Sequence, residues 1–177
     1  MPTISNFKAQ MARGGARPNQ FRVQLTFPSI VGAQGTISAY TGQFLCKSAQ
    51  LPASTLEDIA VSYRGRPVHF AGERTFAPWT VSVYNDENFQ IRNAMERWSN
   101  LVLSYTATNG IVSPSDYQVD MSVFQLNRND DVIKEYRFFD AYPTSVGAIG
   151  LDFDTNNQIE LFDVEFTYNY FTASDIG

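Results

Sequence analysis

Apolar and polar side chains alternate along many short segments of this 177-residue chain. A period of two places successive side chains on opposite faces, as a half-buried β-strand requires. Turn sequences rich in glycine, proline and asparagine separate the segments. Seven or eight such strands predict a mainly β fold, an antiparallel sandwich or barrel of two packed sheets. The clearest alternating segments are residues 21–27, 59–63, 68–70, 76–84, 117–123 and 159–171.

One segment has a helical period instead. Between residues 86 and 103, apolar side chains recur three and four positions apart and form one face, which includes Trp98. Asn85 or Asp86 can accept the free amide hydrogens at the helix start. We therefore expect a single α-helix flanking the sheets, with Trp98 in the core. The expected core also contains aromatic side chains of the strands: Trp79, Phe162 and Phe166.

The last strand, residues 159–171, is the longest one predicted. Its aromatic face includes Phe162 and Phe166, and its other face carries Asp163, Glu165 and Thr167. The sequence thus predicts a strand that is apolar on one side and acidic on the other.

We expect one domain, residues 1–177, with two extensions. Residues 1–20 contain glycines and a proline but little apolar surface, which predicts an extended N-terminal arm. Residues 53–75, approximately, predict a protruding hairpin loop with two arginines at its tip. A two-stranded hairpin is marginally stable alone, so we expect this one to lean on another surface. Residues 28–40 and 104–116 are predicted loops, and a short strand is expected near residues 149–153.

The charge of the chain is unevenly distributed. The net charge is −5, which argues against a general nucleic-acid binder. Residues 1–74 carry eight basic and three acidic side chains, whereas residues 138–177 carry seven acidic side chains and no basic one. A chain that is basic at one end and acidic at the other can attract copies of itself. Alternatively, the two ends meet within one monomer.

The composition of the chain argues against several other classes of protein. With 44% hydrophobic and 18% charged residues, the chain is unlike a disordered one. It has no apolar run of about 20 residues and no signal-peptide pattern at its start, so we expect no membrane partner. A single cysteine and a single histidine exclude an intrachain disulfide and a zinc site of the Cys/His type. We expect no cofactor and no metal.

Two weaker motifs leave alternatives open. Cys46 and His69 could form a catalytic dyad only if the fold brings them together with a third orienting group, and no catalytic fingerprint is present, so we expect no enzyme. Residues 152–163 place oxygen-bearing side chains at spacings like those of a calcium loop, although a β-turn is the simpler interpretation. The second function considered is therefore a β-sandwich binding module, possibly calcium-dependent.

A set of short stretches, in order from residue 16 to residue 171, resembles the tail tube proteins of contractile-tailed bacteriophages (myoviruses). The resemblance is weakest at residues 28–40 and 104–137. The matching stretches are Ala16-Arg17-Pro18-Asn19, Cys46-Lys47 with Leu51-Pro52, Ala71-Gly72-Glu73-Arg74-Thr75-Phe76, Trp79-Thr80-Val81, Asn85-Asp86-Glu87, Tyr142-Pro143-Thr144, Val146-Gly147, Leu151-Asp152-Phe153-Asp154, Asn156-Asn157 and the strand that reaches Tyr170.

The resemblance implies a structural virion protein. Six copies would form a ring, and rings would stack head to tail into the inner tube of the tail, after assembly in the host cytoplasm. The implied partners are the tail sheath, the tape-measure protein, the baseplate hub and the tail terminator, and genomic DNA would pass through the channel without specific binding. We then expect Asp163, Glu165 and Thr167 to line the channel. The expected contacts between rings are Arg64, Arg66 and Arg17.

Overall fold

The computed structural model describes residues 3–11, 14–107 and 109–175 of the chain. Within these residues every strand pairing is antiparallel. The predicted mainly β fold is therefore confirmed.

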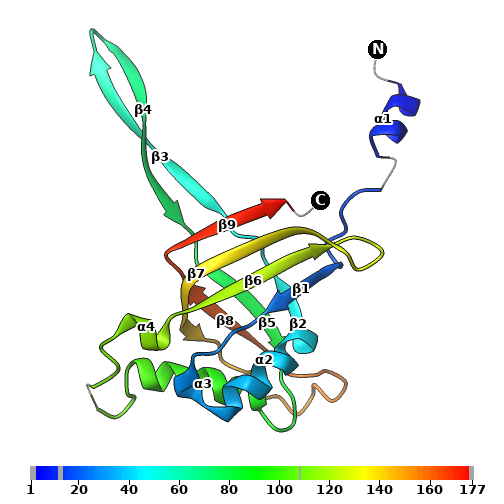
Figure 1. Cartoon of the computed structure of the whole chain (residues 1–177), viewed down its shortest axis with the longest axis vertical. Coiled ribbons are helices and arrows are strands. Elements are labelled where there is room, and N and C mark those ends of the chain that lie inside the picture. The colour runs from blue at the N-terminus through cyan, green and yellow to red at the C-terminus, as the bar shows by residue number, and fades with distance from the viewer. Residues whose placement is uncertain (1–2, 12–13, 108, 176–177) are drawn as a thin grey trace.

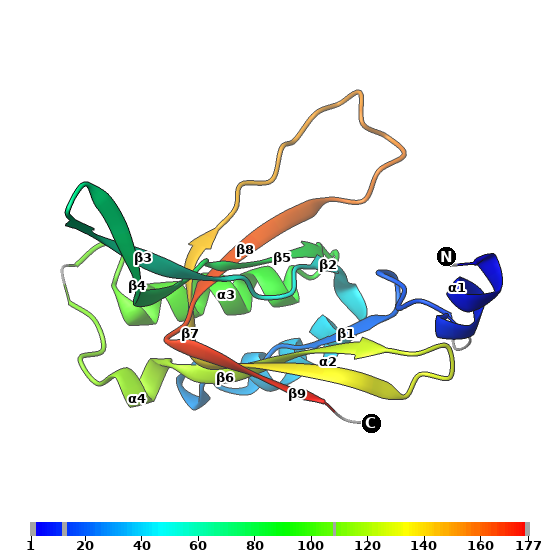
Figure 2. The same ribbon diagram turned by 90° about the horizontal axis from the view of Figure 1, so that it is seen from above.

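Seven strands form two layers that share the long strand β7 (Val132–Val146). The first layer contains β1 (Phe21–Gln24), β6 (Val119–Leu126), the first half of β7, and β9 (Tyr170–Asp175). The second layer contains the second half of β7, β8 (Leu161–Thr167), β5 (Trp79–Tyr84) and β2 (Cys46–Ala49). Figure 2 shows the two layers edge on.

Strand β7 changes layers near Asp140. Its residues 134–139 pair with β9, and its residues 142–146 pair with β8. Asp140 lies between them with a φ of 57°, a left-handed conformation that breaks the regular pleat. The register with β6 also shifts at this point, as at a β-bulge, which bends a strand. The bend allows one strand to serve both sheets.

The remaining two strands form a hairpin that projects from the sandwich. Strands β3 (Ser54–Tyr63) and β4 (Arg66–Phe76) pair only with each other. Figure 1 shows them extending well beyond the two layers. All but two residues in these strands, Gly72 and Phe76, are exposed.

The predicted helix is α3 (Gln90–Val102), and it closes one end of the sandwich. The Asp86 carboxylate accepts a hydrogen bond from the Gln90 amide at the start of the helix, over 2.9 Å. One face of α3 is completely buried, and it contains Ile91, Ala94, Met95 and Trp98.

The prediction of a single helix was wrong. The predicted loop of residues 28–40 instead contains the short 3-10 turn η1 (Ser29–Val31) and most of α2 (Ala33–Leu45). The arm contains α1 (Ile4–Gln10), although residues 1–2 and 12–13 of the predicted arm lie outside the described residues. The second predicted loop, residues 104–116, overlaps α4 (Pro114–Tyr117), while residues 149–153 form no strand.

The core lies between the layers and against α3. Its largest fully buried side chains include Trp79, Trp98, Phe138, Phe162 and Phe166. The Trp79 ring stacks on Phe138 with 4.3 Å between centroids. Both indole N–H groups have carbonyl partners, Gln50 for Trp79 at 2.8 Å and Tyr117 for Trp98 at 2.9 Å, so neither tryptophan leaves a buried donor unpaired.

No helix in the described part of the chain is both long and apolar enough to cross a bilayer.

Candidate functional site

Strand β8 separates apolar from acidic side chains because its residues alternate between two faces. Phe162, Val164 and Phe166 are buried in the core. Asp163 is exposed on the opposite face, and Glu165 and Thr167 are partly exposed there. The three side chains expected to line a channel therefore share the outer face of the second layer.

Strand β5 extends this outer face with hydroxyl groups. Thr80 pairs with Glu165 and Ser82 pairs with Asp163 in the antiparallel register. The Ser82 hydroxyl donates a hydrogen bond to the Asp163 carboxylate. We call the set Thr80, Ser82, Asp163, Glu165 and Thr167 the acidic face.

The acidic face contains two carboxylates and no basic side chain of its own, and the nearest strand to carry a base is β2, where Lys47 is exposed. Neither β5 nor β8 contains a lysine or an arginine. Within the described residues, no basic side chain forms an ion pair with Asp163 or Glu165. A polyanion that approaches this face is repelled by the two carboxylates. The hydroxyl groups between them are neutral.

The outer face of the first layer has a different electrostatic character. Arg137 forms an ion pair with Asp120, with 2.8 Å between nitrogen and oxygen. The Ser122 hydroxyl donates to the Glu135 carboxylate at 3.0 Å. Opposite charges are paired on this face, whereas within the described residues Asp163 and Glu165 of the other face form no ion pair.

The second layer has an open edge on each side. Strand β2 is the last strand of the sheet order, and among the described residues only β5 pairs with it. On the other side, residues 142–146 of β7 pair with β8. Unpaired strand edges present backbone N–H and C=O groups that can pair with another chain.

The predicted contact arginines lie in two separate parts of the molecule (Figure 1). Arg64 and Arg66 flank Gly65 at the turn between β3 and β4, where Arg64 and Gly65 both have positive φ, as in a tight hairpin turn. The Arg64 guanidinium lies 5.4 Å from the centre of the neighbouring Tyr63 ring. Arg17 is exposed before β1, and its carbonyl accepts a hydrogen bond from Gln125.

The structure gives Cys46 and His69 different partners. The Cys46 thiol, in β2, contacts the Ser48 carbonyl at 3.6 Å, and burial raises the pKa of the thiol to about 12. His69 lies on the hairpin, where its Nδ1 is 2.6 Å from a carboxylate oxygen of Asp58. A nucleophile with so high a pKa is almost entirely protonated at neutral pH. The pair is not arranged as a catalytic dyad.

The carboxylates of residues 152–163 are not gathered around one point. Asp163 lies in β8, while Asp152 belongs to the loop before it and accepts a hydrogen bond from the Asp154 amide. In the described part of the chain, no three histidine, cysteine or acidic side chains are close enough together to hold a metal ion.

Sequence reasoning missed one exposed segment, the loop of residues 147–160 between β7 and β8. Leu151 and Phe153 alternate with Asp152 and Asp154, and this alternation suggested a strand. In the structure this segment is an irregular loop. Leu151, Phe153 and Ile159 are exposed to solvent, while Ile149 packs against the core.

Comparison with known proteins shows which protein family the chain resembles. A family model described as phage tail tube protein matches residues 16–174. The chain is similar to tail tube protein gp19 of Enterobacteria phage T4, with 35% identity over 158 residues, which cover 88% of this chain and 90% of that protein.

Two solved structures share the fold. A chain in the cryo-EM structure of the anti-feeding prophage tube terminating cap has a TM-score of 0.66 and 18% identity, with 91% of each chain covered. A chain in the cryo-EM structure of an extracellular contractile injection system, the PVC sheath–tube complex in its extended state, has a TM-score of 0.60 and 12% identity. That match covers 99% of this chain and 100% of the other.

Proposed function

This chain belongs to the phage tail tube family, structural components of the contractile tail of the virion, and we propose that its copies form stacked six-membered rings enclosing an acidic channel for DNA. The observation that carries the proposal is the acidic face, because its two carboxylates lie among hydroxyl groups and neither β5 nor β8 contains a basic side chain.

In the proposed ring, the acidic face of each copy points toward the central hole. Six copies at −5 each would give a ring a formal charge of −30. Charges act over about 8–10 Å at physiological salt, so Asp163 and Glu165 would act on DNA only inside a narrow channel. Their effect there is to prevent adhesion, because a wall of basic residues would bind phosphates and release counterions.

The open edges of the second layer support ring closure. A repeated contact that joins β2 of one copy to residues 142–146 of the next would continue the sheet around the ring. Such a contact is heterologous, and heterologous contacts form a closed ring when the rotation between copies closes. The acidic faces of all copies would then lie on one continuous wall.

Stacking of rings requires a second contact between copies. We propose that the hairpin supplies it, with Arg64 and Arg66 at its tip reaching acidic groups of the next ring and with Arg17 as a further contact. The hairpin supports this role because its exposed strands pair only with each other in the described structure. A head-to-tail contact that does not close generates a filament.

The proposed partners follow from the place of the tube in a contractile tail. The sheath would surround the tube, the baseplate hub and tail terminator would cap its ends, and the tape-measure protein would occupy the channel before DNA does. The shared fold with a chain of a sheath–tube complex supports this arrangement. The role is mechanical and involves no catalytic step.

Assembly of the purified protein tests the proposal. Negative-stain microscopy across a dilution series should show rings and tubes at high concentration and fewer of them on dilution. A particle that stays monomeric at every concentration would contradict it. Asp163→Asn/Glu165→Gln should still assemble, because these side chains face the channel rather than a neighbouring copy.

A further inference from the structure

The β3–β4 hairpin has one apolar face that nothing in the described structure covers. Residue pairs directly opposite each other in the register point to the same side, and these pairs are Ile59 with Phe70 and Val61 with Val68. Tyr63 continues this side near the tip. Each of the five side chains is between 43% and 63% exposed. We call Ile59, Val61, Tyr63, Val68 and Phe70 the apolar hairpin face.

The opposite side of the hairpin has no large apolar side chain between residues 58 and 71 and carries the charged and polar ones. Asp58 and His69 form their 2.6 Å contact there, and Ala60 and Ser62 lie beside them. The hairpin is therefore amphipathic, although it has no core of its own. An amphipathic two-stranded sheet of this length needs a second surface to bury its apolar side.

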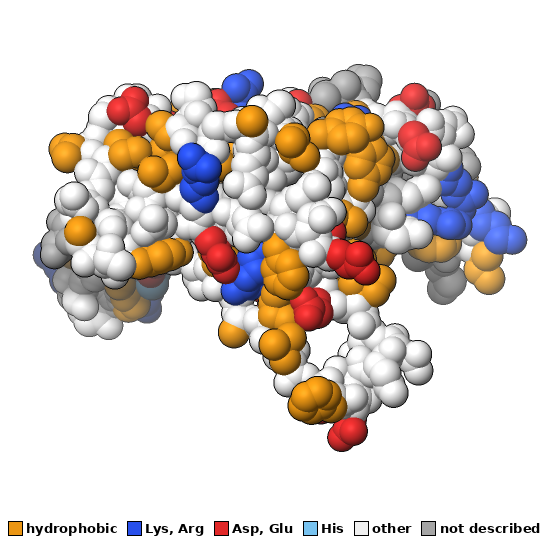
Figure 3. All heavy atoms as spheres, turned by 90° about the horizontal axis from the view of Figure 1, so that it is seen from below, with side chains coloured by type: hydrophobic (Ala, Val, Ile, Leu, Met, Phe, Trp, Pro, Cys, Tyr) orange, Lys and Arg blue, Asp and Glu red, His pale blue; other side chains and the backbone are white. Residues whose placement is uncertain are grey.

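The loop of residues 147–160 is complementary to the hairpin. It exposes apolar side chains, as the hairpin does, and carries acidic residues where the hairpin carries arginines. Leu151 is 82% exposed, Phe153 is fully exposed and Ile159 is 67% exposed. Asp152 and Asp154 alternate with the first two of these side chains. Figure 3 shows this loop standing out from the body of the molecule, with hydrophobic and acidic side chains along it.

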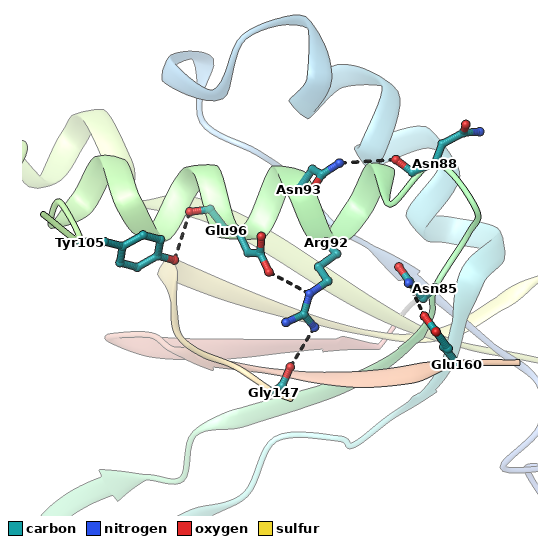
Figure 4. A network of polar contacts seen from close by, with 8 residues as sticks. All are labelled: Asn85, Asn88, Arg92, Asn93, Glu96, Tyr105, Gly147 and Glu160. Atoms are coloured by element: carbon teal, nitrogen blue, oxygen red, sulfur yellow. Dashed lines mark hydrogen bonds and ion pairs between the residues drawn. The ribbon is translucent and has the colours of Figure 1, made fainter. Parts of the chain in front are cut away.

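The loop is held firmly at both ends. Arg92 of α3 donates a hydrogen bond to the Gly147 carbonyl at 2.9 Å, and it also pairs with Glu96 (Figure 4). The Asn85 side chain donates to the Glu160 carboxylate at 2.8 Å, and the Asn85 amide donates to the Glu160 carbonyl. These contacts fix the base of the loop while its middle stays in solvent. A structureless loop of this length in a compact domain is usually a functional one.

We propose that the apolar hairpin face of one copy docks on the 147–160 loop of a second copy in the adjacent ring. Leu151 and Phe153 would cover the apolar hairpin face, and Asp152 and Asp154 would face Arg64 and Arg66. This inference rests on the proposed stacking of rings and names the surface that receives the hairpin.

Charge and placement support this pairing over docking on another exposed apolar surface, that of α2. The α2 helix exposes Ile37, Tyr40 and Phe44 but contains no charged residue, so it offers no partner for the arginines. The hairpin and the loop lie toward opposite ends of the long axis in Figure 1, so the contact joins different copies and repeats head to tail.

Cysteine cross-linking of assembled tubes tests the proposal. The variant carries Val61→Cys and Phe153→Cys in a Cys46→Ser background, and oxidised tubes are run on a non-reducing gel. We expect a ladder of covalent multimers, at least about tenfold above the yield of a control pairing Val61→Cys with Val112→Cys. Val112 is 95% exposed and lies outside the proposed contact. Tubes that give no ladder above this control, or a ladder only when Val61→Cys is combined with Tyr40→Cys on α2, would overturn the pairing.

A charge swap provides a second test that does not depend on cysteines. Arg64→Glu/Arg66→Glu should raise the concentration needed for tube formation by about tenfold, since each ring addition makes the contact in every copy. Adding Asp152→Arg/Asp154→Arg should restore assembly, whereas adding Glu87→Lys/Asp116→Lys should not. If wild-type tubes form but the swap fails to rescue, the pairing is wrong and the proposed function stands. If wild type forms no tubes, both fail.

Discussion

Two glycines in the connection between β7 and β8 differ sharply in the space around them. A Cβ atom on Gly147 would lie 2.8 Å from the backbone oxygen of Asp163, whereas one on Gly150 would meet nothing within 4 Å. We predict that Gly147→Ala lowers the free energy of unfolding by about 1–3 kcal/mol, because backbone atoms of β8 must move. Gly150→Ala should change it by less than about 1 kcal/mol. Urea unfolding at dilutions that prevent assembly measures both, and equal effects would contradict the packing described at Gly147.

The Cys46 thiol should be nearly inert in the folded protein. Burial raises its pKa to about 12, from an ordinary value of 9.0. Reaction with iodoacetamide requires the thiolate, so at pH 8 we predict alkylation about 1,000-fold slower in the native protein than in guanidinium. Mass spectrometry over time measures both rates, and native alkylation within tenfold of the unfolded rate would disprove the prediction.

The same shift sets the direction of a pH effect on stability. The folded-state pKa lies above the unfolded one, so the contribution of the protonated thiol is complete below about pH 9 and is lost as the pH rises toward 12. A Cys46→Ala variant should lack this part of the alkaline loss.

The acidic side chains of β8 could be placed on one face from the sequence, because alternation alone determines which residues of a strand point the same way. The neighbours of these side chains could not be predicted. Ser82 contacts Asp163 from a strand 81 residues away in the sequence, and no local pattern encodes that register.

At the scale of elements, the two longest helices show why one was predicted and the other was not. Helix α3 has a strongly one-sided distribution of apolar residues, which sequence periodicity detects. Helix α2 has no charged residue and contains Gly35 and Gly42. A Cβ at either glycine would come within 3.0 Å of Phe27 or Leu25, so the helix depends on close backbone packing against neighbouring segments. Glycines that favour a loop by propensity are here required by packing.

The predicted strand of residues 159–171 is two strands in the structure. Strand β8 ends at Thr167 and β9 begins at Tyr170, on the other layer. At the break, the Asn169 amide donates to the Phe139 carbonyl and its side chain donates to the Asp140 carboxylate. Aromatic side chains alternate through the break as they do in β8. The sequence pattern therefore gave no sign that the backbone turns there. The longest strand is β7 instead.

Hydrogen exchange tests the role of the hairpin as an element. In dilute monomer, amides of β3 and β4 should exchange faster than those of β5 and β8, because the hairpin is exposed on both sides. Assembly should slow exchange in residues 54–76 and 147–160 by at least about tenfold, while α3, already buried, changes little. Mass spectrometry of digested samples measures this. Unchanged exchange in both segments would show that the hairpin and the loop stay free in the tube.

At the scale of the whole molecule, the charge on the acidic face should decide whether assembled tubes retain DNA. We predict that Asp163→Lys/Glu165→Lys tubes retain short duplex DNA at least about tenfold more than wild-type tubes, and that added salt removes the difference. The matched control Glu87→Lys/Asp116→Lys makes the same change in net charge at exposed positions outside this face. Equal retention by both variants would mean that net charge alone matters.

The most direct measurement is a cryo-EM map of the assembled protein at a resolution that shows side chains. We expect the second layer of every copy to form the inner wall, with Asp163, Glu165 and Thr167 facing the central hole and the paired charges of the first layer facing outward. A map in which Asp163 and Glu165 point away from the hole, or a protein that never polymerises under conditions that keep it folded, would contradict the account.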